Sequence, residues 1–131
     1  MTTMTNTSAG EITRRAVLKA SELGVPACIA VVDAGAHLVS FQRMDGAFLG
    51  AIDVAQRKAR TSALFPLGSG DFGELIADQR LTGMEQSNGG LAAFHGGLPI
   101  SKEDSLVGAI GVSGGTAEQD LEIARFALGQ D

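Results

Sequence analysis

The fold is decided by residues 27–44, ACIAVVDAGAHLVSFQRM. Residues 27–32 are a continuous apolar run of strand length, and residues 37–44 resume after a short turn that contains Gly35. Two strand-length segments joined by a short glycine-containing turn are typical of an antiparallel hairpin. We therefore expect a sheet in which the first two strands are neighbours.

Predicted helices flank this hairpin. Ser8 followed by Glu11 is a capping-box pattern, and it predicts a helix that runs to residue 23 and ends at Gly24. A second helix is predicted over residues 51–65, before Pro66. Its small apolar residues recur at helical spacing and predict a face that packs closely: Ile52, Ala55, Ala59 and Ala63.

The second half of the chain begins with a glycine-rich excursion over residues 66–90, with weak signs of a short helix at 71–79. Strand-like residues follow on both sides of His95-Gly96-Gly97, and again at 106–112. Thr116 is a predicted N-cap for a last helix. The order helix, strand, strand, helix, loop, strands, helix predicts an α+β protein with one central antiparallel sheet.

Composition limits the function classes. The chain has 131 residues, which fits one domain, and we place it at residues 8–131 after a flexible segment 1–7. A net charge of −5 without Trp or Tyr argues against nucleic acid as a partner. The single cysteine, Cys28, fits a cytoplasmic setting, and we expect neither a secretory signal nor a membrane segment.

Four segments, in order, resemble one family: VVDAGAHLVSFQRMDGA (31–47), DVAQRKARTSALF (53–65), GGLPI (96–100) and VGAIGVSGG (107–115). Over about residues 8–128 the chain resembles the haem-binding, haem-degrading-domain family of GlcG-like, HbpS-like and PduO C-terminal-like proteins. The resemblance implies a single five-stranded antiparallel sheet with flanking helices, of the profilin/PAS-like kind. It also implies a homo-oligomer, from dimer to octamer, and haem as the leading candidate ligand.

The two histidines are the first candidates for chemistry. His37 and His95 are each a candidate ligand for haem iron, and together they are a candidate two-histidine metal site. The alternatives are a turn histidine that bonds the backbone at position 37 and an exposed loop histidine at position 95. Family members that hold haem through a histidine of the first helix have no counterpart here, because residues 9–23 contain none.

Basic and small residues supply further candidate ligand contacts. Arg43 has a planar guanidinium suited to carboxylates, although an internal pair with Asp45 explains it equally well. Lys58 and Thr61 match the family's K-A-x-T segment, which lines the ligand pocket in haem-binding members; a solvated helix face or a subunit contact is the alternative. Gly96 allows a ligand close to the backbone.

Residues 84–91, MEQSNGGL, combine a carboxylate with a tight-turn sequence. Glu85 and His95 are candidate catalytic groups, with Asn88 and the Gly89 amide as donors to a ligand. An Asn-Gly pair also forms a tight turn without any further role.

Three functions remain open from the sequence. The first is a ligand-binding protein for haem or a related planar anionic ligand. The second is a cofactor-independent enzyme, or accessory protein, of small organic or aromatic acid catabolism with a Glu85/Asn88/His95 pocket. The third is an oligomeric scaffold without chemistry. We expect the glycine-rich stretch 68–97 to form one wall of any site.

Overall fold

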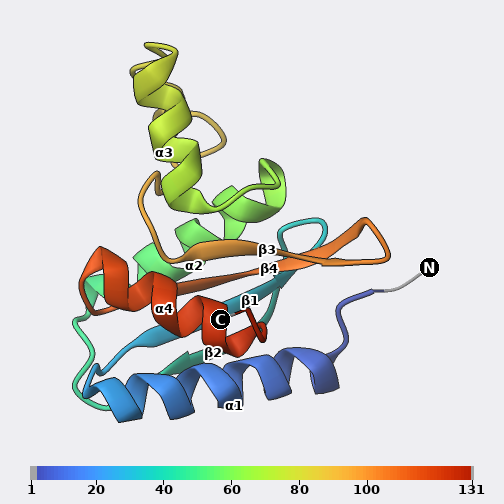
Figure 1. The fold of residues 1–131 in the computed structure, drawn as a ribbon, viewed down its shortest axis with the longest axis vertical. Coiled ribbons are helices and arrows are strands. Elements are labelled where there is room, and N and C mark those ends of the chain that lie inside the picture. The colour runs from blue at the N-terminus through green and yellow to red at the C-terminus, as the bar shows by residue number, and fades with distance from the viewer. Residues whose placement is uncertain (1–2, 131) are drawn as a thin grey trace.

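The computed structural model describes residues 3–130, and within them the chain forms four α-helices around one four-stranded sheet (Figure 1). All strand pairs are antiparallel, in the order β2-β1-β4-β3. The elements are α1 (Asn6–Leu23), β1 (Cys28–Asp33), β2 (Leu38–Arg43), α2 (Gly50–Leu64), α3 (Ser69–Asp78), the 3-10 turn η1 (Met84–Gln86), β3 (Gly97–Lys102), β4 (Ser105–Ser113) and α4 (Ala117–Ala127).

The predicted hairpin is confirmed. β1 and β2 are antiparallel, with Ala30 opposite Phe41. β1 also pairs with β4 along its other edge, where Ala30 lies opposite Gly111. Its residues Cys28 to Val32 are buried, because helices cover both faces of the sheet. The continuous apolar run that identifies this strand in the sequence therefore reflects its central position.

The α+β class is confirmed, but the implied five-stranded sheet is wrong, because the sheet within residues 3–130 has four strands. The strand-like residues before His95 form no strand. The Ala92 N–H donates to the Thr61 hydroxyl at 3.0 Å, and Leu91 packs against Phe72 and Ile76 of α3. A side-chain partner and an apolar cluster replace the ladder that a fifth strand would need.

Helices cover the two faces of the sheet differently. α1 and α4 share one core with Ile29 and Val31 of β1, and α2 covers the opposite face through Ala55 and Ala59 (Figure 1). α2 approaches closely because Gly111 has no side chain; a Cβ there would collide with the backbone of Ala55. The alanine face predicted for this helix is thus confirmed, with the closest contact at a glycine of β4.

The helix ends agree only in part with the sequence patterns. α1 begins at Asn6 with Thr5 as its N-cap, because the Ser8 N–H donates to the Thr5 hydroxyl at 3.1 Å. The predicted capping box on Ser8 is therefore wrong, and Asn6 and Thr7 of the expected flexible segment 1–7 are helical, while residues 1 and 2 lie outside the described residues. Gly24 ends α1 in the left-handed conformation, with φ 70°, as predicted.

The glycine-rich excursion contains more order than its sequence indicates. α3 is a ten-residue helix that projects away from the sheet (Figure 1). It is fixed at its base by Phe72, whose ring stacks on Phe65 with centroids 4.8 Å apart. Across residues 3–130, no helix combines the length and apolarity that a membrane crossing requires.

Candidate functional site

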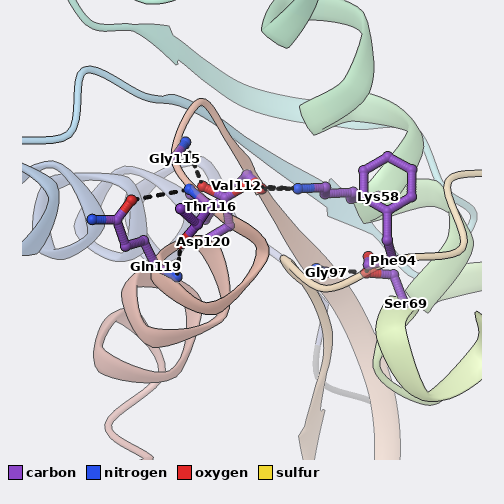
Figure 2. A network of polar contacts seen from close by, with 9 residues as sticks. All are labelled: Lys58, Ser69, Phe94, Gly97, Val112, Gly115, Thr116, Gln119 and Asp120. Atoms are coloured by element: carbon purple, nitrogen blue, oxygen red, sulfur yellow. Dashed lines mark hydrogen bonds and ion pairs between the residues drawn. The ribbon is translucent and has the colours of Figure 1, made fainter.

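A buried lysine joins the two layers of helices. Lys58 of α2 is 1% exposed, and its ammonium donates to the Val112 carbonyl at 2.8 Å and to the Asp120 carboxylate at 3.0 Å (Figure 2). The Phe94 ring lies over the ammonium, 5.0 Å from its centroid, a cation–π contact. Burial lowers the pKa of Lys58, and the nearby Asp120 carboxylate offsets part of that shift.

Asp120 of α4 is the partner of Lys58 in this ion pair. One carboxylate oxygen accepts from Lys58, and the other accepts from the Gly115 N–H at 2.9 Å. Thr116 caps the same helix in a capping box with Gln119, which confirms the predicted N-cap (Figure 2). The first turn of α4 is thereby fixed to α2 as well as to its own preceding loop.

The backbone on both sides of His95 is held in place. The Ser69 hydroxyl donates to the Phe94 carbonyl at 2.5 Å and accepts from the Gly97 N–H at 2.8 Å (Figure 2). The Gly96 carbonyl accepts from the Val112 N–H at 2.9 Å. Gly96 has φ +132°, and a Cβ there would approach the Lys58 ammonium to 2.6 Å, so this position requires glycine.

His95 itself lines a groove beside α4. The groove has a volume of about 430 Å³ and is lined by His95, Glu118, Leu121, Glu122, Arg125 and Gln130. The imidazole lies against Gly70 of α3, where a Cβ would overlap the Nδ1 atom. His95 is half-buried, and the neighbouring Phe94 is 50% exposed. The groove offers an imidazole, a guanidinium and an apolar side chain, together with the carboxylates of Glu118 and Glu122.

Thr61 is placed differently from the candidate ligand contact predicted for it. Its side chain is fully buried, and its hydroxyl donates to the Arg57 carbonyl at 2.7 Å while accepting from the Ala92 N–H. Lys58 is likewise enclosed rather than displayed on a basic surface. The structure therefore gives both residues a role in holding the segment that leads to His95.

The basic residues beside them clamp the glycine-rich turn. Arg57 donates to the carbonyls of Gly89 and Gly90, each at 2.9 Å, and Arg60 donates to the Asn88 carbonyl at 3.0 Å. Asn88 adopts φ 54°, as expected for the tight turn. The Glu85 carboxylate accepts from the Gly83 N–H at 2.9 Å. These contacts order the turn locally, and neither Glu85 nor Asn88 lines the groove that holds His95.

His37 and His95 lie toward opposite ends of the sheet. His37 follows Asp33, which pairs with Gly108, whereas His95 precedes Gly97, which pairs with Gly111. Three strand positions separate these levels by about 10 Å, and both histidines lie farther out. A single chain does not bring them together, and no cluster of three or more metal-ligating side chains occurs within residues 3–130.

His37 is held in the hairpin turn. The Asp33 carboxylate accepts from the N–H groups of His37 and Gly35, each at 2.9 Å, and lies 3.3 Å from the imidazole. The imidazole is 81% exposed. Arg43 is exposed at the far end of β2, and the residues that the structure describes include no ion pair between it and Asp45.

The α4 wall of the groove is absent from the sequence-based candidates. Asp120 looks in the sequence like one of several acidic residues that favour a helix N-terminus. Its distinguishing feature is a partner 62 positions away, Lys58, which no local pattern reveals. Arg125 carries no local signal either, since a basic residue in the last helical turn is common.

Comparison with known proteins relates nearly the whole chain to one family. Residues 4–129 match the family model described as haem degrading protein HbpS-like. An uncharacterised 15.0 kDa protein from the dhaT-dhaS intergenic region of Citrobacter freundii is 35% identical over 128 residues, which cover 96% of this chain and 90% of that protein. Corrinoid adenosyltransferase PduO of Citrobacter freundii is 34% identical over 120 residues, 90% of this chain and 36% of PduO.

The solved structures agree with this match. The crystal structure of a PduOC:heme complex superposes with a TM-score of 0.92 at 29% identity, covering 98% of this chain and 94% of that chain. The family model spans nearly all residues that the structure describes, and the fold is shared along the same length. The chain therefore belongs to the HbpS-like family.

Proposed function

We propose that this protein binds haem or a related planar anionic ligand in the groove at His95. The observation that supports it most is the likeness of nearly the whole chain to the haem-complexed PduOC structure. The groove has a volume of about 430 Å³, within the range of about 300–1,000 Å³ that small-molecule sites occupy.

The groove supplies one candidate iron ligand, His95, and one guanidinium, Arg125, beside the carboxylates of Glu118 and Glu122. Haem iron is held in proteins by His, Cys, Met or Tyr. Cys28 is fully buried in β1, and the Met44 sulfur accepts from the Ala27 N–H at 3.4 Å, so both are engaged in the core. His95 would hold the iron, and Arg125 would pair with a carboxylate of the macrocycle. Bound haem would supply a redox-active iron centre.

The chain's own residues prepare this site before a ligand arrives. Ser69 fixes the backbone on both sides of His95, and Lys58 with Asp120 fixes α4 opposite it. Less conformational freedom is then lost on binding than in an open loop. Phe94 is 50% exposed, and its ring packs over the Lys58 ammonium, which holds the residue next to His95 in place.

Hemin titration tests the proposal. Wild-type protein should give a saturable Soret shift, and His95→Ala should weaken binding at least about tenfold or change the ligation spectrum. His37→Ala is the matched control, because it removes an exposed imidazole away from the groove and should leave binding unchanged. Equal curves for wild type and His95→Ala, or loss of binding in His37→Ala alone, would contradict the assignment.

Self-association is also part of the proposal. Large apolar side chains are exposed over much of the surface: Leu18, Leu38, Phe48, Leu49, Leu64, Leu75, Leu81 and Phe94. Phe48 and Leu49 are adjacent and 75% and 74% exposed, a costly arrangement for a monomer. Light scattering should show a homo-oligomer, and a monomer at micromolar concentration would contradict this part.

The alternative of a cofactor-independent enzyme has less support. It depends on Glu85, Asn88 and His95 acting on one substrate. His95 lines a groove with residues of α4, whereas Glu85 and Asn88 bond within their own turn.

A further inference from the structure

A second groove lies at the β3–β4 turn, at the end of the sheet away from Gly96 and Gly97. It has a volume of about 310 Å³ and is bounded by α1, by the C-terminal end of α4 and by the turn-proximal ends of both strands. Its apolar lining includes Ile12, Ile100, Val107 and Leu128. Arg15 and Lys102 are on its rim, and it shares only Gln130 with the groove at His95.

The charge of this groove is opposite in sign to the net charge of the chain. The chain as a whole carries −5, yet neither Arg15 nor Lys102 forms an ion pair within the described range 3–130. Glu11, the acidic residue on the same rim, is engaged by two donors of Arg14, at 2.7 and 3.1 Å. The groove therefore presents net positive charge beside an apolar lining.

The Arg15 guanidinium is held in place by contacts with Phe126 of α4. One terminal nitrogen donates to the Phe126 carbonyl at 3.1 Å, and the guanidinium lies 5.8 Å from the centroid of the Phe126 ring. This contact also caps the C-terminal end of α4. It occupies one of five N–H donors, and the part of the chain described here supplies no acceptor for the other four. A held guanidinium with free donors is suited to a carboxylate.

We propose that this groove binds a small organic acid with an apolar body, such as an aromatic or branched aliphatic carboxylate. The carboxylate pairs with Arg15, Lys102 adds a second positive charge, and the apolar body packs against the half-buried Ile12 and Leu128. This site goes beyond the proposed function, because binding there requires neither His95 nor an iron centre.

Benzoate is the test ligand, and benzamide is its neutral counterpart of similar shape. Titration of the ligand-free protein, followed by amide NMR shifts, should give saturable benzoate binding with the shifts gathered on α1, the end of α4 and the β3–β4 turn. Benzamide should bind at least about tenfold more weakly, since it lacks the charge that Arg15 recognises. Equal binding of the two compounds, or no saturation by about 10 mM benzoate, would overturn the proposal.

Variants locate the site and separate it from the haem proposal. Arg15→Gln should weaken benzoate binding at least about tenfold, whereas Arg80→Gln, an exposed charge beyond α3, should not change it. Should Arg15→Gln unfold through loss of its contact with α4, Arg14→Gln is the second variant; it releases Glu11 toward the groove and should also weaken binding. His95→Ala should bind benzoate normally even if it loses hemin. Benzoate binding unaffected by either arginine variant would overturn the assignment.

Discussion

Lys58 is a fully buried charged residue whose ammonium is paired with a buried carboxylate. Its ammonium and the Asp120 carboxylate are both almost fully buried, at 1% and 2% residue exposure, and each satisfies the other. Removing one partner leaves an uncompensated buried charge, whereas replacing both removes most of that penalty. The destabilisation caused by removing one partner is therefore larger than the net stabilisation that the intact pair provides.

We expect Lys58→Met to lower the free energy of unfolding by about 3–5 kcal/mol, the usual cost of breaking a buried pair. The double variant Lys58→Met/Asp120→Asn should recover part of this loss, because the amide oxygen still accepts from the Gly115 N–H. Urea denaturation of both variants measures the difference. Arg14→Met, which breaks an exposed ion pair, is the control and should unfold like the wild type. A Lys58→Met protein as stable as that control would contradict the account.

Asp33 gives the hairpin turn a predictable pH dependence. The His37 N–H, followed by the Gly35 N–H, holds the pKa of Asp33 below its ordinary value of 3.8. A carboxylate with a lower pKa in the folded state stabilises above that ordinary value, and this contribution is lost as the pH falls through the folded pKa. The difference in unfolding free energy between wild type and Asp33→Asn should therefore shrink between about pH 6 and pH 2. A difference that stays constant across this range would show that the charge has no such role.

At the scale of elements, the contact between α3 and the residues before β3 sets the position of His95. Gly70→Ala should push the imidazole aside, because the new Cβ would overlap its Nδ1 atom. The conflict is with a side chain that can rotate, so we expect a folded protein with hemin binding weakened about as much as in His95→Ala.

Gly10→Ala is the matched control for this substitution. Gly10 is exposed on α1, and a Cβ at this position would have no neighbouring atom within 4 Å. Ala there should raise stability by about 0.5–1 kcal/mol without altering hemin binding. The same hemin titration and thermal unfolding curve serve both variants. Unchanged hemin affinity in a folded Gly70→Ala protein would show that the imidazole position is not needed for binding.

Local patterns predict most of the elements, and they do so where local chemistry decides. The β1–β2 hairpin, the alanine face of α2, the Gly24 end of α1 and the Thr116 cap all depend on residues near one another in the chain. Residues 91–94 are an exception. Their apolar pattern is typical of a strand, but the Ala92 N–H bonds the Thr61 hydroxyl and Leu91 packs against α3. The prediction of the first N-cap is wrong because Thr5 and Ser8 both carry a hydroxyl that can cap a helix. In the structure Thr5 is the N-cap of α1.

At the scale of the whole molecule, the candidate site is assembled from segments that the sequence cannot join. His95 is recognisable as a candidate from its glycine neighbours alone. Its opposing wall on α4 and the Lys58–Asp120 tie depend on contacts 54 and 62 residues apart, so they follow from the packing of two layers rather than from any motif. The glycines matter here as close contacts: Gly96 and Gly111 let α2 and its lysine approach the sheet.

The most direct test of the central claim is a crystal structure of the assembled protein loaded with hemin. We expect iron coordinated by a nitrogen of His95, with the macrocycle in the groove beside α4 and a propionate at Arg125. Lys58 and Asp120 should remain paired beneath Phe94. Iron bound by any other side chain, or a macrocycle that leaves this groove empty, would contradict it.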